Sequence, residues 1–549
     1  MKLIAIIPAR GGSKGILNKN MRLLGNYPLI YYSIRTATSA GIFDEIVVTS
    51  DSDEILHYAA NYGVSTLKRT DELSRDNVTL DPVIYDALSK SEMSNNTLYD
   101  VVVTMQPTSP LLSCETLLKA VNSFIKENVY DTYISAVNKP HLAWTYENSI
   151  YTPAYKKRLN RQELPPYYIE TGGFMICNRE NITKTSRLGK SVSVYPIPTS
   201  EAIDIDYMND WLICEAELSR KRIVFRTDAY RTLGMGHLYR TVTLCNAMME
   251  HDIVVVLKND HALGVNMIQK MGLKYHVVND EDEFITYLGE IKADIAIIDC
   301  MNTTKGYIEK IKETVTKVVV FEDNGEGSKY ADVVINPMIE EKTLEQNRYC
   351  GARYFCLRDE FLLRVPKPFS PVVNSVFVSF GGSDPSDITT KTYKAACSLI
   401  EKYADLTFNF VIGLGFDENK KHELVPIPNK IDVIYDTPHI SKYMSTADIA
   451  VISNGGTAFE ICSLGIPGIV LSHNLREVKH KFTQIHNGFI NLGLSSEIET
   501  HTICNTIEWL MNTPRIRDEM RNLMLSVNLK NGTNNVKNII LRSFYEPDR

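Results

Sequence analysis

A cationic, glycine-rich stretch near the start of the chain is the first candidate for chemistry. Residues 8–20 read PARGGSKGILNKN, and residues 1–43 contain six lysines and arginines but no aspartate or glutamate. Glycines let the backbone approach a ligand closely and point its N–H groups at an anion. A nucleoside triphosphate carries about four negative charges, so a cationic loop suits phosphoryl chemistry. The alternative is a glycine-rich surface turn with solvated lysines, and the stretch is not a Walker A motif.

Two aspartates and a proline-rich segment are further candidates. Asp204 and Asp206 lie two residues apart in AIDIDY, and in an extended segment this spacing puts both carboxylates on one side. Hard oxygen donors of this kind suit Mg²⁺, although a turn with two solvated aspartates is the alternative. The segment QPTSPL (residues 106–111) follows a predicted strand, and its polar side chains are suited to bind a ribose or a sugar. The alternative for this segment is a rigid structural turn.

Together, in this order and spacing, the segments at 8–20, 68–76, 106–111 and 202–206 resemble the acylneuraminate cytidylyltransferases (CMP-sialic acid synthetases). The resemblance covers about residues 1–220. It implies that the anomeric hydroxyl of a nine-carbon 2-keto sugar acid attacks the α-phosphate of CTP and releases pyrophosphate. It leaves open whether the sugar is N-acetylneuraminate or a legionaminic- or pseudaminic-type acid.

The same resemblance implies a role for each matching residue. Arg10 and Lys19 are the expected catalytic residues, which stabilise charge on the triphosphate, and Mg²⁺ is the expected cofactor. The expected nucleotide-binding residues are Ala9, Gly11, Gly12, Ser13, Lys14, Asn20, Arg69 and Gln106. The expected sugar-binding residues are Thr108, Ser109, Gly172 and Gly173, and the expected metal ligands are Asp204 and Asp206.

A second candidate site follows a strand near residue 223. Residues 223–240 read IVFRTDAYRTLGMGHLYR, so a strand leads through a glycine-containing loop into a helix that begins near His237. A helix N-terminus with adjacent glycines favours a diphosphate. His237 suits general acid or base chemistry because an imidazole titrates near neutral pH. The alternative is a capping or packing histidine.

Residues 222–495 resemble the UDP-sugar hydrolase of pseudaminic acid biosynthesis, which has a fold like the two-Rossmann glycosyltransferases. The matching stretches include FVSFGGSDP (377–385), CLRDEF (356–361) and SNGGTAFE (453–460). The resemblance implies that water cleaves a UDP-linked N-acetylated amino sugar, with His237 as the proton-transfer residue and Asp228 as its support. The expected nucleotide-binding residues are Gly382, Ser383, Asn454, Gly455, Gly456, Thr457 and Glu460, and the expected sugar-binding residues are Gly236, Arg240 and Asn474. A glycosyltransferase and a non-catalytic nucleotide-sugar-binding module are the alternatives.

Short apolar strands alternate with helical segments along the whole chain, which predicts parallel sheets with crossover helices. A helix over Asn209–Lys221 followed by a fresh strand at Arg222–Arg226 marks one boundary, and three prolines in Val365–Val373 mark another. We expect domains at 1–220, 221–368 and 369–549. The expected fold class is α/β: an N-terminal Rossmann-like nucleotidyltransferase domain followed by a two-domain, glycosyltransferase-B-like module with two Rossmann-like halves.

Composition limits the class of protein. The 549 residues are 44% hydrophobic and 23% charged, which is ordinary for a globular protein. Apolar runs are far shorter than the roughly 18–20 residues that span a bilayer, and a net charge of −7 argues against nucleic-acid binding. Ten scattered cysteines without a CxxC pair argue against a zinc site and predict a reducing, cytoplasmic location. The expected partners are CTP, a nonulosonic acid, a UDP-sugar and, as an oligomer, a second copy of the chain.

Overall fold

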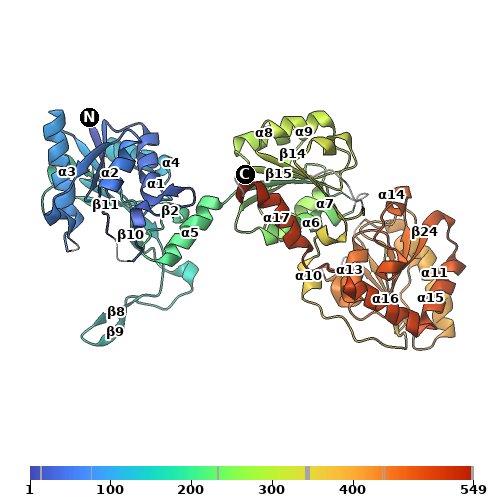
Figure 1. Ribbon diagram of the computed structural model, residues 1–549. Helices are drawn as coiled ribbons and strands as arrows, with labels where there is room; N and C mark the ends of the chain where they lie inside the picture. The colour runs from blue at the N-terminus through green and yellow to red at the C-terminus, as the bar shows by residue number, and fades with distance from the viewer. Residues whose placement is uncertain are drawn as a thin grey trace. The chain divides into compact units, whose positions relative to one another are not determined.

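The computed structural model describes residues 1–12, 15–75, 77–230, 234–340, 347–413, 415–435, 437 and 439–545. The chain forms two compact units, Met1–Arg220 and Lys221–Arg549 (Figure 1). Each unit is built from strands joined by helices, as the alternating pattern of the sequence predicts.

The first unit is organised around one seven-stranded sheet in the order β11-β7-β10-β6-β1-β4-β5. Its strands are β1 (Leu3–Pro8), β4 (Glu45–Ser50), β5 (Ser65–Lys68), β6 (Val101–Thr104), β7 (Thr132–Asn138), β10 (Tyr168–Asn178) and β11 (Val192–Pro196). Strand β1 pairs in parallel with β4 on one side and β6 on the other. The strand order therefore reverses between β1 and β6, and the chain continues from these two strands in opposite directions across the sheet. Open α/β sheets bind ligands at such a switch point.

Helices cover both faces of this sheet because its central strand is apolar on both sides. Ala5 and Ile7 of β1 belong to a core cluster with residues of α1 and α4, whereas Ile4 and Ile6 pack with residues of α3. This alternation is the two-residue period of a strand. The helices are α1 (Leu29–Ala40), α2 (Asp53–Ala60), α3 (Leu80–Asn95), α4 (Cys114–Glu127) and α5 (Met208–Ser219).

Two features of this unit were not predicted. Strand β10 runs antiparallel to β6 and β7, with a register shift between Glu170 and Met175. A hairpin of β8 (Trp144–Glu147) and β9 (Ile150–Pro153) extends from the body of the unit, and all eight of its strand residues are exposed (Figure 1). The remaining strands, β2 (Leu23–Leu24) and β3 (Tyr27–Pro28), form a short antiparallel pair.

The second unit contains two parallel sheets with the same strand order. The first sheet is β14-β13-β12-β15-β16-β17-β18 and the second is β21-β20-β19-β22-β23-β24. The strands of the first are β12 (Arg222–Thr227), β13 (Asp252–Lys258), β14 (Tyr275–Val278), β15 (Ile295–Asp299), β16 (Lys317–Phe321), β17 (Val333–Asn336) and β18 (Arg348–Cys350). Those of the second are β19 (Ser375–Ser379), β20 (Thr407–Ile412), β21 (Ile431–Tyr435), β22 (Ile449–Ser453), β23 (Gly468–Ser472) and β24 (Phe489–Leu494).

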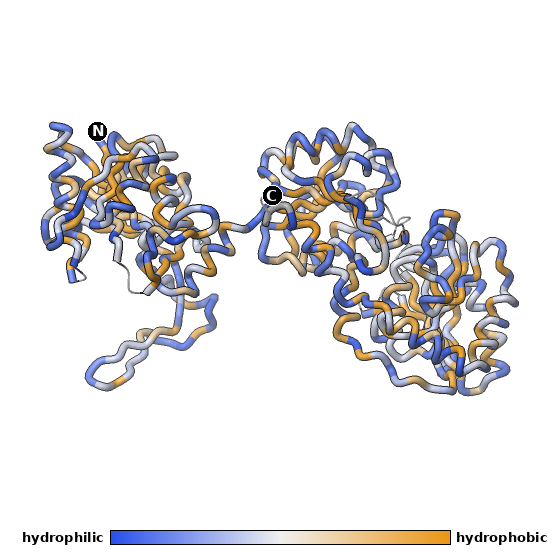
Figure 2. Tube along the Cα trace, viewed as in Figure 1, coloured by the Kyte–Doolittle hydropathy of each residue, from blue (hydrophilic) through white to orange (hydrophobic). Residues whose placement is uncertain are grey.

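Both sheets therefore begin with the order 3-2-1-4-5-6 that defines a Rossmann-like half, and the predicted fold class is confirmed. The helices of the first half are α6 (Gly236–Ala247), α7 (Ala262–Lys270), α8 (Glu281–Glu290) and α9 (Lys305–Lys312). Those that follow are α10 (Asp359–Leu362), α11 (Ile388–Lys402), α12 (Ile440–Met444), α13 (Thr457–Leu464), α14 (Leu475–Val478), α15 (Thr500–Met511), α16 (Pro514–Ser526) and α17 (Gly532–Tyr545). Figure 2 shows the apolar strands inside each half beneath more polar helices.

The last helix corrects one domain boundary. We expected residues 369–549 to form the second half, but Val536, Ile540 and Leu541 of α17 pack into the core of the first half. Lys317 of β16 donates to the carbonyls of Ile539 and Ile540, each at 2.8 Å. These packing contacts and hydrogen bonds are all made with residues of the first half, so α17 belongs to the first half.

In the part of the chain that the structure describes, we find no helix that is both long and apolar enough to span a lipid bilayer.

Candidate functional sites

The loop after β1 is held against the end of β4. The amide of Ala9 donates to the Thr49 carbonyl at 3.0 Å, and the amide of Gly11 donates to Asp51 Oδ1 at 2.8 Å. The side-chain amide of Asn20 donates to the carbonyl of Arg10 at 2.9 Å. These bonds hold the segment from Ala9 to Gly11, and with it Arg10, at the switch point of the sheet. Ser13 and Lys14 lie outside the described residues.

The two aspartates of the AIDIDY segment meet the same loop through Lys19. Its Nζ donates to the Ile205 carbonyl at 2.6 Å and lies 3.9 Å from Asp206 Oδ1. Burial lowers the pKa of Lys19, and the charges of Asp206 and Asp204 oppose that shift. Two segments almost 190 residues apart therefore form one cluster of a cation and two carboxylates.

Several buried polar atoms beside this cluster lack a hydrogen-bond partner among the described residues. They are Asn20 Oδ1, Thr108 Oγ1, Ser109 Oγ and Asp204 Oδ1. A buried polar atom without a partner costs about 1–3 kcal/mol, so a ligand that supplies the missing bonds is favoured here. Burial also raises the pKa of Asp204, since an ionised carboxylate is poorly solvated in such a place.

Gly172 faces these orphan atoms across the site. A Cβ built on it would lie 2.9 Å from Ser109 Oγ and 3.1 Å from Asp204 Oδ2. A Cβ built on Gly173 would lie 3.2 Å from a different hydroxyl, that of Ser135. The structure therefore brings Gly172 into the site and leaves Gly173 beside it.

We predict that Gly172→Ala lowers the rate of catalysis by the first unit at least tenfold, because the added methyl group displaces either Ser109 or Asp204. The check is the initial rate together with the thermal unfolding midpoint of the same variant. A variant that unfolds at the wild-type temperature and retains the wild-type rate would contradict this placement.

Two other expected nucleotide-binding residues have protein partners. Arg69 is buried and donates from Nη2 to the Thr49 carbonyl at 2.7 Å and from Nε to the Thr49 hydroxyl at 3.3 Å. Burial lowers its pKa to about 10. The backbone amide of Gln106 donates to the Gly172 carbonyl at 3.1 Å, while Ile205 donates to the Thr108 carbonyl at 2.8 Å. These bonds join the proline-rich segment to β10 and to the aspartates.

The donor set is compatible with Mg²⁺. Among the described residues no group of three or more histidine, cysteine or acidic side chains is arranged to hold a metal ion. Mg²⁺, however, commonly binds through one or two carboxylates together with substrate phosphates and waters. Asp204 Oδ1 is buried and has no hydrogen-bond partner in the part of the chain that the structure describes. Asp206 is largely exposed, so both carboxylates are available for such binding.

In the second unit, His237 lies in the first turn of α6 and is buried. Its Nδ1 is 2.5 Å from Asp299 Oδ1 at the end of β15. We expected Asp228 to support His237, but Asp228 pairs with Arg226 Nη1 at 2.8 Å. The supporting carboxylate is therefore Asp299, which the sequence analysis missed. Its only sequence signal is a polar residue that ends a buried apolar strand.

Arg240, which we expected to bind a sugar, forms part of this cluster. Its Nε and Nη2 bond to Asp299 at 2.8 and 2.6 Å, and its Nη1 pairs with Glu322. Its guanidinium also lies 5.0 Å from the centre of the Phe321 ring. One turn of helix separates Arg240 from His237 on α6, which is why both side chains reach the same carboxylate.

The glycine-rich loops of the two halves meet beside this cluster. A Cβ on Gly382 would lie 3.1 Å from Gly234 Cα, and Gly234 precedes Gly236 at the start of α6. We expected Gly382 and Ser383 to cradle a pyrophosphate. Asp384, however, already accepts hydrogen bonds from the amides of Ile388 and Thr389 at 3.0 and 2.6 Å. The first amides of α11 are thus bound to a protein carboxylate.

Three more side chains expected to hold the nucleotide sugar have internal partners. Asn454 is buried, donates to the Glu477 carbonyl at 2.7 Å and accepts from Thr483 at 2.7 Å. Glu460 pairs with Arg358 at 2.8 Å. Asn474 caps α14 through amide bonds of 3.1 Å. The residues of this group that remain partly exposed at the start of α13 are Gly455, Gly456 and Thr457.

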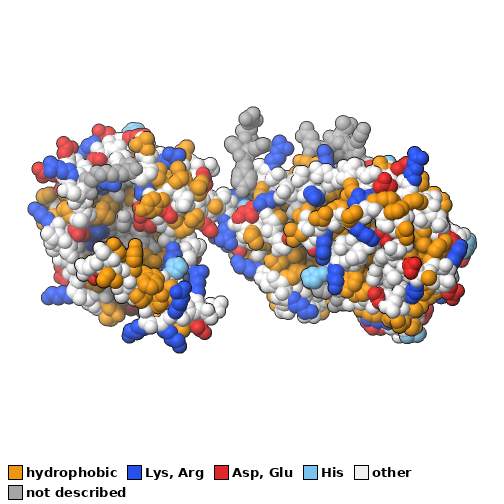
Figure 3. All heavy atoms as spheres, turned by 90° about the horizontal axis from the view of Figure 1, so that it is seen from below, with side chains coloured by type: hydrophobic (Ala, Val, Ile, Leu, Met, Phe, Trp, Pro, Cys, Tyr) orange, Lys and Arg blue, Asp and Glu red, His pale blue; other side chains and the backbone are white. Residues whose placement is uncertain are grey.

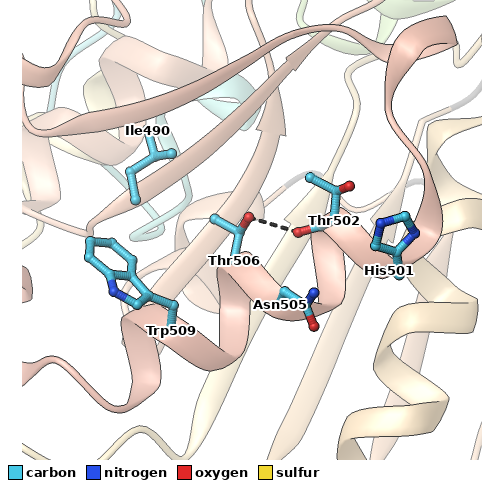
Figure 4. Close-up of a pocket in the computed structure, with 6 residues that line it drawn as sticks. All are labelled: Ile490, His501, Thr502, Asn505, Thr506 and Trp509. Atoms are coloured by element: carbon cyan, nitrogen blue, oxygen red, sulfur yellow. Dashed lines mark hydrogen bonds between the residues drawn. The ribbon is translucent and has the colours of Figure 1, made fainter.

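A surface pocket of about 400 Å³ lies elsewhere in the second unit. Figure 4 shows His501, Thr502, Asn505, Thr506 and Trp509 along α15, with Ile490 opposite. No lysine or arginine lines it, so it lacks the charge that a diphosphate requires. Figure 3 shows acidic and basic side chains interspersed over the visible face of both units, as the modest net charge implies.

Comparison with known proteins agrees with the geometry of the first unit, an α/β nucleotide-binding domain. A family described as cytidylyltransferase matches residues 4–224. A pseudaminic acid cytidylyltransferase of Campylobacter jejuni is 32% identical over 217 residues, which are 38% of this chain and 93% of that protein. The chain therefore belongs to the cytidylyltransferase family through its first unit.

One further relative and one solved structure are similar to other or longer parts of the chain. An uncharacterised protein of Methanocaldococcus jannaschii is 30% identical over 277 residues, 46% of this chain, and the chain spans only 56% of that relative's length. A solved structure of MurG from Acinetobacter baumannii is 12% identical to this chain, with a TM-score of 0.44. The matched region covers 59% of this chain and 99% of the MurG chain.

Proposed function

We propose that the first unit transfers CMP from CTP to a sialic-acid-like nonulosonic acid and releases pyrophosphate. One observation carries the proposal: the Arg10 loop, Lys19 and the Asp204–Asp206 pair converge at the switch point of the sheet. The cytidylyltransferase family match covers the same residues.

The chemistry assigns a task to each group. The anomeric hydroxyl oxygen forms a bond to the α-phosphorus of CTP while the bond to the pyrophosphate oxygen breaks and that oxygen keeps the electron pair. Arg10 and Lys19 stabilise the negative charge that develops. Asp204 and Asp206 hold Mg²⁺, which neutralises phosphate charge when bound. Ser109 and Gly172 line the side of the site where buried polar atoms need partners.

The test is to incubate the full chain with CTP, Mg²⁺ and, separately, N-acetylneuraminate, a legionaminic-type acid and a pseudaminic-type acid, and to follow pyrophosphate. Release with one of these acids supports the proposal and identifies the sugar. No release with any of them rejects it.

All ten cysteines are free, as is usual in reducing compartments, so we also propose a cytoplasmic location.

For the second unit we propose hydrolysis of a UDP-linked N-acetylated amino sugar. The support is a pair of Rossmann-like halves whose glycine loops meet beside a buried histidine. Water would attack the anomeric carbon while His237 accepts a proton from that water. The bond between the anomeric carbon and the phosphate oxygen would break, and UDP would leave with the electron pair. UDP release without an acceptor supports hydrolysis. Release only with an acceptor indicates a glycosyltransferase, and no release indicates a binding module.

We also propose that the chain forms a homodimer, supported by the β8–β9 hairpin. Trp144, Tyr146, Ile150 and Tyr151 on it are between 54% and 70% exposed, and aromatic side chains dominate the energy of protein interfaces.

We predict that Tyr146→Ser with Tyr151→Ser weakens dimerisation at least tenfold, because each tyrosine supplies a large apolar contact. Sedimentation equilibrium would show the shift from twice 62.1 kDa toward 62.1 kDa. Leu188→Ser, an exposed residue of the same unit outside the hairpin, is the matched control. A wild-type monomer, or an unchanged dissociation constant in the double variant, would reject the role of the hairpin.

A further inference from the structure

We propose that Asp299, Arg240 and Glu322 act as positioning residues that make His237 a base, with Nε2 as the nitrogen that takes the proton. The inference rests on the proposed hydrolysis by the second unit and deepens it. It is carried by a buried hydrogen-bonded cluster that joins α6, the end of β15 and the residue after β16.

The geometry determines which nitrogen of His237 bears the proton. Arg240 makes two bonds to Asp299. Burial by itself would raise the pKa of Asp299, but the charges of Arg240 and His237 outweigh it and lower that pKa to about 2. An ionised carboxylate only accepts hydrogen bonds, so the 2.5 Å contact with Asp299 requires a proton on His237 Nδ1. Arg240 Nη2 lies 3.1 Å from the same nitrogen but is a donor only, and cannot bond to a protonated nitrogen.

The net charge of the cluster depends on whether His237 carries one proton or two. With neutral His237, Asp299 and Glu322 contribute two negative charges and Arg240 one positive charge, so the cluster carries a net charge of −1. With a proton on both ring nitrogens of His237, the net charge is zero. Asp299, Glu322 and Arg240 are each less than one-tenth exposed as whole residues, and unbalanced charge is costly in such surroundings. The cluster therefore stabilises His237 after it has removed a proton from water.

Without the charge of Glu322, the cluster with neutral His237 would carry no net charge. The backbone of Glu322 has φ of +50°, a left-handed conformation that non-glycine residues rarely adopt. Strain of this kind costs about 1–3 kcal/mol and is found where the surrounding structure fixes a side chain for function. Among the described residues, the other groups near the cluster include the Phe321 ring and two thiols. Burial raises the pKa of Cys356 to about 12 and raises that of Cys300, which lies next to Asp299. None of these three groups contributes a charge at neutral pH.

The first test measures the pH dependence of kcat/KM for UDP-sugar cleavage by the full chain. A base must be deprotonated to act, so activity should fall on the acid side. Glu322→Gln keeps an oxygen to accept from Arg240 but removes the negative charge. The acid limb should then move to lower pH, because one negative charge of the cluster is lost. Glu281→Gln, which alters an Arg–Glu pair with Arg226 in the same half, should leave the limb in place. An unmoved acid limb in Glu322→Gln, or an effect on the alkaline limb alone, would overturn the base role.

The second test does not depend on activity. Nitrogen chemical shifts of ¹⁵N-labelled histidine in the full chain, with His237 assigned through His237→Gln, report which ring nitrogen is protonated. We expect the Nδ1–H form in the wild type and its loss in Asp299→Asn, whose amide can also donate to the ring. The opposite form in the wild type would overturn the inference whatever the chain cleaves. The expected form without any UDP release would reject the proposed hydrolysis and the base role but keep Asp299 as the residue that orients His237.

Discussion

Asp204→Asn should lower CMP-sugar formation by about two to three orders of magnitude, the loss typical of removing one group that stabilises transition-state charge. The substitution keeps the shape of the side chain and removes the charge of an oxygen that is buried without a partner among the described residues. It should also raise the Mg²⁺ concentration needed for half-maximal rate. The measurement is pyrophosphate release against Mg²⁺ concentration.

Asp206→Asn should have a smaller effect, about tenfold, because an exposed charge interacts through a medium of high dielectric constant. Its side chain is 70% exposed. Glu115→Gln is the control, since Glu115 forms an exposed ion pair with Lys119 on α4 and should leave the rate unchanged. Wild-type rates for Asp204→Asn at limiting Mg²⁺ would show that the metal assignment is wrong.

Burial adds a pH dependence to the same site. The pKa of Asp204 is raised by burial, so this carboxylate takes up a proton at higher pH than an ordinary aspartate as the solution is acidified. The protonated form cannot hold Mg²⁺. The metal-dependent rate should therefore fall on mild acidification, and added Mg²⁺ should restore it.

Much of the fold could be predicted because buried parallel strands have a clear sequence signal. β1, β15 and β22 are short, fully buried apolar runs, which favour parallel sheets covered on both faces. The direction of β10 carries no such signal, since pairing with β6 and β7 depends on residues far apart in the chain. The hairpin was missed because its strand residues are exposed and give no pattern of burial.

The two sites differ in how far the sequence specifies them. In the first unit the predicted motifs contact one another directly. Lys19 of the first motif bonds to the Ile205 carbonyl and lies near the Asp206 carboxylate of the last. In the second unit the partner of a side chain decides its role, and that partner is set by tertiary structure. Asp228 lies nearer to His237 in sequence, yet Asp299, 62 residues away, makes the bond. Asn454 has a ligand-binding residue type, but its amide is occupied within the protein.

A single substitution in the second unit should separate the two proposed activities. His237→Ala should reduce UDP-sugar cleavage by about two to four orders of magnitude, the range for loss of a general base, because nothing else in the Asp299 cluster can accept the proton of water at neutral pH. CMP-sugar formation should be unchanged, since the variant alters the second compact unit and the cytidylyl site lies in the first. UDP and pyrophosphate release from one preparation measure both.

The control is His422→Ala, an exposed histidine of the same unit, which should leave both rates unchanged. Cleavage by His237→Ala at the wild-type rate would exclude a proton-transfer role for His237. Loss of both activities together with a lowered unfolding temperature would show that the buried His237–Asp299–Arg240 cluster mainly stabilises the fold. Loss of cleavage alone, with an unchanged unfolding temperature, is the result that a base held in place by Asp299 requires.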